Sequence, residues 1–322
     1  MLSRLAAAAL LAGLPASAQV PLTPVDPDAT LVEELVVTAR ERGPAFWRVE
    51  DADTVVHVLG VPSLAPKRMA WDQAGFMRRL AGANVVVVPA KGMRVRLAGA
   101  PGAAISYLRL KSSRPFEETL SPAEQARFAS ARARLGKPPG RYGTKNPLAA
   151  GLLLITDYRD THSLSDQDPN KLIRLLASQA GVPIESKTYD LSPLLGAVVK
   201  AGDGAGRACL DEALRDVDQG PDGTLAATRA WADGDVRGAL AAERTYERCI
   251  NSVPGAAALD ARIKADQAAQ IAQALKRPGH AIAVVQLRPL LSQGGVLDRL
   301  RAQGFTVKTP GEADAEPTDP AV

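Results

Sequence analysis

Val55-Val56-His57-Val58-Leu59-Gly60 begins a strand–turn–helix–strand pattern that decides the fold, because the pattern recurs near the other end of the chain. The first copy runs on to Pro89, and the second extends from Ala281 to Lys308. Four positions match at the same spacing: Gln73, Gly75, Arg79 and Leu80 recur as Gln293, Gly295, Arg299 and Leu300. We therefore expect the two copies to lie side by side in one sheet, with the turns after their first strands forming one cleft.

The region between the copies has a different pattern. A hairpin is predicted over 46–59, with its turn at 51–53, and strand-like segments continue to about Leu110. From about 121 to 277 the chain is predicted to be helical, starting with a capping box at Ser121–Glu124 and including long helices over 235–251 and 256–277. The order of sheet unit, helical block and sheet unit predicts an α/β (α+β) fold: a mixed central sheet with a large helical insertion.

Length and composition indicate a globular protein, and the first residues of the chain predict that it is exported. The 322 residues are 46% hydrophobic, with a net charge of +4 and 4% aromatic residues. Basic residues form no stripe interleaved with aromatics, so we expect no nucleic-acid binding. Residues 1–18 are predicted to be a cleavable signal peptide, with Arg4, the apolar run Leu5–Leu14 and the small residues Ala16-Ser17-Ala18. Later apolar runs are too short to span a bilayer, so we expect a periplasmic protein without a membrane span after cleavage.

Cys209 and Cys249 are the two cysteines of the chain, and both fall in predicted helices. An oxidising compartment would allow them to form a disulfide. The alternative is two buried free thiols.

The two ends outside the repeat are predicted to be irregular. Residues 19–43 are expected to form a flexible segment, and 309–322 a disordered acidic tail. The N-terminal segment contains Glu33-Glu34-Leu35-Val36-Val37-Thr38, which looks like the TonB box of outer-membrane receptors. An extended segment of this kind could add a strand to a partner's sheet edge, so TonB is a possible partner. The alternative is an ordinary edge strand or helix of the domain.

Several short stretches in order resemble the TraB/GumN family, relatives of the Tiki-type metal-dependent proteases. They are Pro44-Ala45-Phe46-Trp47-Arg48-Val49, Leu59-Gly60, Trp71, Ala83-Asn84, Glu243-Arg244 and Leu300–Val307. The resemblance covers residues 44–308 and implies a divalent metal and hydrolase or peptidase activity.

The positions at which the resemblance implies metal ligands carry other residues. Ser63 stands in place of the histidine of the first Gly-x-x-His turn, Pro89 in place of a strand-terminal glutamate, and Arg288 in place of the second histidine. A divalent metal needs imidazole or carboxylate ligands, and a permanent positive charge repels it. We therefore expect no cofactor and no metal site.

Three hypotheses follow. The first is a non-catalytic binding or regulatory module, with Ser63, Glu243, Arg244 and Arg288 lining the old cleft and the arginines binding an anionic or peptide ligand. The second is an active metal-dependent peptidase that recruits Glu243, His57 or Glu185 as ligands. The third is an adaptor for TonB-dependent uptake that works through residues 31–42.

Overall fold

Strand β2 (Thr54–Val61) pairs in parallel with strand β9 (Gly279–Gln286) along its whole length, so the two repeat copies lie side by side as expected. This pairing is the centre of the computed structural model. The structure describes residues 26–39, 41–89, 93–94, 108, 111–166, 168–190, 194, 196–198 and 203–313.

The central sheet has six strands in the order β10-β1-β2-β9-β4-β7. The other four strands are β1 (Phe46–Glu50), β4 (Val86–Val87), β7 (Ile184–Glu185) and β10 (Thr306–Lys308). β1 runs antiparallel to both β2 and β10, whereas β2, β9, β4 and β7 are parallel. The predicted hairpin and the α/β fold with a mixed sheet are thus confirmed. The edge strand β7, however, comes from within the segment predicted to be helical throughout.

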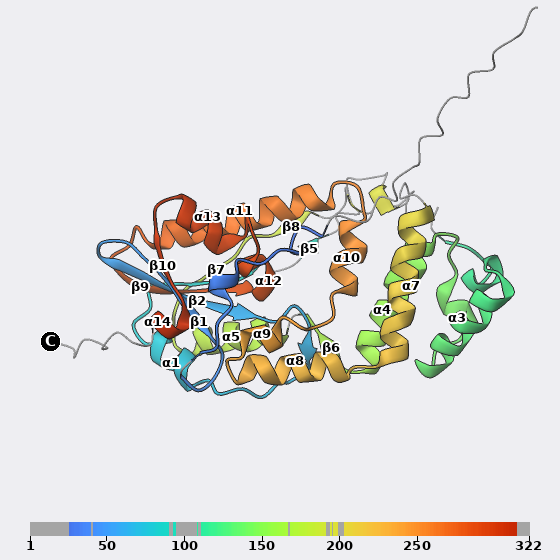
Figure 1. Cartoon of the computed structure of the whole chain (residues 1–322), viewed down its shortest axis with the longest axis horizontal. Coiled ribbons are helices and arrows are strands. Elements are labelled where there is room, and N and C mark those ends of the chain that lie inside the picture. The colour runs from blue at the N-terminus through green and yellow to red at the C-terminus, as the bar shows by residue number, and fades with distance from the viewer. Residues whose placement is uncertain are drawn as a thin grey trace, which may run out of the picture.

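Helices cover both sides of this sheet, as Figure 1 shows. On one side lie α11 (Ala256–Ala274) and α13 (Val296–Ala302); on the other lie α1 (Ala74–Leu80), α5 (Asp168–Gln179), α8 (Asp222–Ala232) and α9 (Val236–Ala239). Because the parallel strands are covered on both faces, β9 is a nearly continuous apolar run that is buried from Ala281 to Val285.

A second hydrophobic core lies beside the sheet, at the right of Figure 1. It is formed mainly by α3 (Pro122–Arg134), α4 (Pro147–Thr161), α7 (Asp203–Gln219) and α10 (Thr245–Asn251). Ser121 and Glu124 form the predicted capping box of α3. α4 and α7 approach closely at Gly151, where a Cβ would come within 3.1 Å of the Leu210 backbone nitrogen.

The remaining elements are short. They are η1 (Glu33–Leu35), β3 (Ala65–Pro66), β5 (Met93–Arg94), η2 (Phe116–Thr119), η3 (Pro139–Tyr142), β6 (Leu164–Ser165), β8 (Tyr189–Asp190), α12 (Leu287–Leu291) and α14 (Pro310–Ala313). β3 pairs with β6, and β5 pairs with β8.

The single helix predicted over 235–251 is wrong: it is two helices, α9 and α10, with an irregular turn between them. The turn persists because its polar groups have partners outside a helix. The carbonyl oxygen of Leu240 accepts a 2.6 Å hydrogen bond from Arg288, and the Glu243 carboxylate accepts one from the backbone N–H of Thr245.

Both ends that were predicted to be irregular contain residues with defined structure. At the C-terminus, the Glu312 carboxylate of α14 accepts hydrogen bonds from the Thr309 N–H and hydroxyl at the start of the helix, and Pro310 is buried. At the N-terminus, residues 26–39 pack along the domain and Leu35 is fully buried. Composition alone predicted flexibility because it does not reveal these caps and contacts.

Other expectations lie outside the described residues. These are the signal peptide (1–18), most of the strand-like stretch after Pro89 and the tail beyond residue 313. Within the part that is described, no helix has both the length and the apolarity needed to cross a membrane.

Candidate functional site

The carboxyl ends of β2, β9 and β4 meet at one edge of the sheet because these strands are parallel neighbours. Ser63 follows β2, Arg288 follows β9 and Pro89 follows β4. In open α/β sheets, ligands bind in the crevice beyond this edge. The two copies differ there: after β2 the chain continues through Pro62-Ser63, whereas β9 runs directly into α12, whose second residue is Arg288.

A pocket of about 380 Å³ lies where α12 meets the turn between α9 and α10 and the helix α7 of the second core. This volume is within the range of about 300–1,000 Å³ that is typical of small-molecule sites. Three of the four predicted cleft residues, Glu243, Arg244 and Arg288, line it, and Ser63 does not. The charged lining also includes Glu212, Arg215, Asp216 and Arg248.

Arg288 is half-buried in this pocket, and its recorded hydrogen bonds go to backbone carbonyls. It donates to Leu240 at 2.6 Å and to Asp28 at 3.5 Å. Among the described residues it forms no ion pair with a carboxylate. Burial, with Arg244 nearby, lowers the pKa of its guanidinium. The pocket therefore contains a desolvated cation with no direct ion pair among the described residues, and the nearby Asp26 and Asp28 carboxylates offset its charge only without contact.

Arg244 differs from Arg288 because its charge is already neutralised. Its guanidinium pairs with Asp26 and with Asp28, the latter at 3.4 Å. Asp28 also binds Lys264 of α11 at 2.6 Å, and these three side chains are nearly inaccessible to solvent. The arginine pair predicted to bind an anion is thus brought together, but one member is held by carboxylates of the chain's own N-terminal segment.

An acidic pair, Asp216 and Glu243, forms the other side of the pocket. Asp216 is 7% exposed; its Oδ1 accepts a hydrogen bond from the Thr245 hydroxyl at 3.1 Å, and its buried Oδ2 has no donor. Burial and the adjacent Glu243 carboxylate raise the pKa of Asp216 to about 8. Asp216 therefore keeps its proton near neutral pH, and that proton satisfies the oxygen without a donor.

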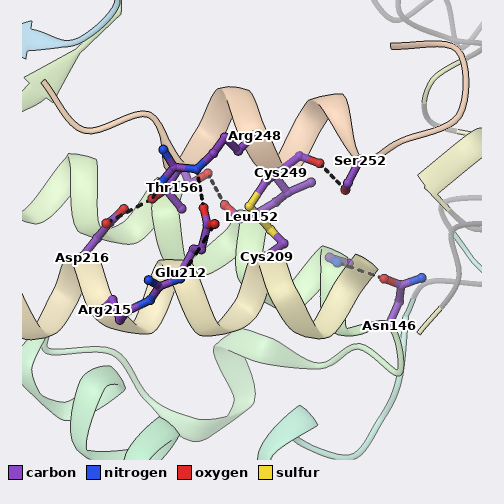
Figure 2. The surroundings of a disulfide bond; sticks show 12 residues. Asn146, Leu152, Thr156, Cys209, Glu212, Arg215, Asp216, Arg248, Cys249 and Ser252 are labelled. Atoms are coloured by element: carbon purple, nitrogen blue, oxygen red, sulfur yellow. Dashed lines mark hydrogen bonds and ion pairs between the residues drawn. A yellow bond between two sulfur atoms is a disulfide. The ribbon is translucent and has the colours of Figure 1, made fainter. Parts of the chain in front are cut away.

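A disulfide fixes this wall of the pocket. Cys209 of α7 is bonded to Cys249 of α10, with 5.0 Å between the Cα atoms (Figure 2). Figure 2 also shows Arg248 of α10 reaching Glu212 of α7, at 2.8 Å. The predicted disulfide is present. In the chain-entropy model, closing a loop of this length stabilises the fold by about 4 kcal/mol.

The residues proposed as alternative metal ligands are not brought together. His57 lies in β2 beside His280, Glu185 pairs with Arg277, and Glu243 accepts a hydrogen bond from the backbone N–H of Thr245. Within the described ranges no group of three or more His, Cys, Asp or Glu side chains could hold a metal.

The residues at the implied ligand positions do not fit a metal either. Pro89 offers a carbonyl already bound by Arg174 at 3.0 Å, Ser63 offers a weak hydroxyl ligand, and Arg288 offers a cation. We therefore derive no metal-dependent step, and the metallopeptidase hypothesis stays a prediction.

The TonB-box-like segment is docked on its own domain. Glu33–Leu35 form a 3₁₀ turn, Leu35 and Val36 are buried, and Thr38 forms an isolated antiparallel bridge with Asp235. Binding to an outside partner would require this segment to leave its present position. Partner binding by Glu33–Thr38 stays a prediction.

Sequence reasoning missed the residues that complete the site: Asp216, Asp28 and Lys264. Each carries an ordinary charge on a helix or near a terminus, and no motif marks it. The available signal was local: Asp26-Pro27-Asp28 places two acids two residues apart immediately before the apolar segment.

Comparison with known protein families gives a match over most of the chain. A sequence model of the TraB/PrgY/gumN family matches residues 45–309. No curated protein and no solved structure matches the chain.

Proposed function

Since the chain belongs to the TraB/PrgY/gumN family, and its cleft carries an arginine where the resemblance implies a metal ligand, we propose that it is a non-catalytic binding module for a small carboxylate. The observation that supports this most is Arg288: a half-buried cation, lining a pocket, whose recorded hydrogen bonds go to carbonyls. A carboxylate that enters the pocket would supply the missing counter-charge.

The acidic pair fits the same role. The protonated Asp216 carboxyl carries no negative charge, which favours entry of an anion beside Arg288. The pocket would thus bind a carboxylate through the Arg288 guanidinium, beside a neutral carboxyl that does not repel it.

We also propose that the protein works after export, in the periplasm. The Cys209–Cys249 disulfide supports this proposal, because disulfides persist in oxidising compartments and are rare in the cytosol.

The test is calorimetric binding of the tripeptide Ala-Ala-Ala and of its C-terminal amide. The free carboxylate should bind and the amide should not. Arg288→Ala should weaken binding about tenfold, the loss expected for a charge-assisted hydrogen bond. Arg237→Ala, which removes an exposed arginine paired with Glu33, and Ser63→Ala are the matched controls and should leave affinity unchanged. Equal binding of acid and amide, or unchanged affinity in Arg288→Ala, contradicts the proposal.

A further inference from the structure

The N-terminal strap, residues 26–39, crosses the domain as an acidic peptide on a basic surface. Each of its four acids meets at least one basic side chain. Asp26 binds Arg244, Asp28 binds Arg244 and Lys264, Glu33 binds Arg237 at 2.7 Å and Glu34 binds Arg301 at 2.9 Å. The basic residues come from α9, the turn after it, α11 and α13, so the surface is assembled from distant parts of the sequence.

Backbone pairing holds the middle of the strap. Val32 N–H donates to the Leu291 carbonyl at 2.9 Å, and Gln293 N–H donates to the Thr30 carbonyl at 3.0 Å. These bonds flank an isolated antiparallel bridge between Leu31 and Ser292. Main-chain pairing of this kind gives affinity that does not depend on the identity of the strap's side chains.

Further along, one apolar side chain anchors the strap. Leu35 is fully buried in the main core, and its carbonyl accepts a hydrogen bond from the Trp47 indole at 3.2 Å. The strap thus combines the three elements of a docked peptide: charged contacts at one end, strand pairing in the middle and an apolar anchor.

We propose that this surface is a binding site for an acidic, extended peptide of another protein, and that the strap is an exchangeable internal ligand for it. The matching chemistry is Asp-x-Asp followed by an extended stretch and a leucine anchor. This goes beyond the carboxylate pocket, because it requires no small anion beside Arg288. The internal strap holds its site at a high effective concentration, so an outside peptide binds the intact protein weakly until the strap is loosened.

The experiment uses the full chain and a fluorescent synthetic peptide of residues 26–39, with binding measured by anisotropy. Asp26→Asn/Asp28→Asn in the protein loosens the strap, so peptide affinity should rise about tenfold. The same two substitutions in the peptide should weaken its binding to that variant about tenfold. Asp211→Asn/Asp218→Asn in the protein removes exposed ion pairs of α7 outside the strap and is the charge-matched control, with little change expected.

Hydrogen exchange at Val32 and Gln293 reports strap release directly, and both amides should exchange faster in the Asp26→Asn/Asp28→Asn protein. Asp26→Asn alone leaves the buried Asp28–Lys264 pair intact and should show a smaller change in the same direction, which keeps the test valid if the double variant fails to fold. Three results overturn the proposal: the strap is not released, the released protein does not bind the peptide, or it binds both peptides equally. None of them bears on tripeptide binding at Arg288.

Discussion

The two copies of the repeat unit share one sheet and one register, yet they end differently. Gly60 and Val61 of β2 lie beside Val285 and Gln286 of β9. Beyond them, the first copy continues to Ser63, which does not line the pocket, and the second begins a helix that carries Arg288 into it. The comparison teaches that a repeated scaffold positions the crevice, whereas the few residues after each strand determine what can bind there.

Inside the sheet, the two copies differ at Gly60. A Cβ there would lie 2.5 Å from the Leu287 side chain and 2.9 Å from Trp47, whereas its register partner Val285 carries a full side chain. Gly60→Val should lower the free energy of unfolding by about 3 kcal/mol, measured by urea denaturation. Val285→Ala, at the partner position, creates only a small cavity and should cost about half as much. If Gly60→Val unfolds at the wild-type urea concentration, the copies do not differ in packing here.

The two copies should also differ in their response to acid. β2 carries a histidine, His57, whereas the paired position in β9 is the apolar Ile282. Burial, with Arg79, His280 and Arg48 nearby, lowers the pKa of His57 to about 3. The unfolded state therefore binds a proton that the folded state does not, and stability falls as the pH drops from about 6.5 towards 3. With allowance for partial exposure, we expect a loss of about 2 kcal/mol by pH 4.

His57→Gln should remove that part of the acid dependence in urea titrations between pH 7 and pH 4. His162→Gln, at the end of α4, is the matched control and should leave the dependence as it is. A His57→Gln protein that loses stability in parallel with the wild type would show that the imidazole titrates normally.

The smallest expected effect is on the pH dependence of ligand affinity in the pocket beside the second copy. The Asp216 carboxyl keeps its proton at pH 7 because its pKa is raised to about 8. Above that pH the pocket gains a negative charge, so the affinity for N-acetylated Ala-Ala-Ala, which has no amine to titrate in this range, should fall about threefold between pH 7 and pH 9. Asp216→Asn should bind equally at both values.

Asp218→Asn, an exposed change on the same helix, is the control for Asp216→Asn and should keep the wild-type pH profile. An Asp216→Asn protein with an unaltered profile would place the titrating group elsewhere.

The paired strands, the mixed sheet, the capped helices and the disulfide could be predicted from the sequence, because each depends on local periodicity, caps or cysteine count. The candidate cleft was predicted in part: Glu243, Arg244 and Arg288 do meet. What could not be predicted depends on contacts between residues far apart in the chain. Asp28 reaches Arg244 and Lys264, and Asp216 meets Glu243, only after α7, α10 and the strap have packed.

The central claim is that this cleft carries a cation where the resemblance implies a metal. The most direct test is the metal content of the folded protein after incubation with manganese, cobalt or zinc and dialysis. We expect no stoichiometric metal, together with carboxylate binding that depends on Arg288. Retention of about one equivalent of metal by the wild-type protein, lost in Glu243→Gln, would contradict the account.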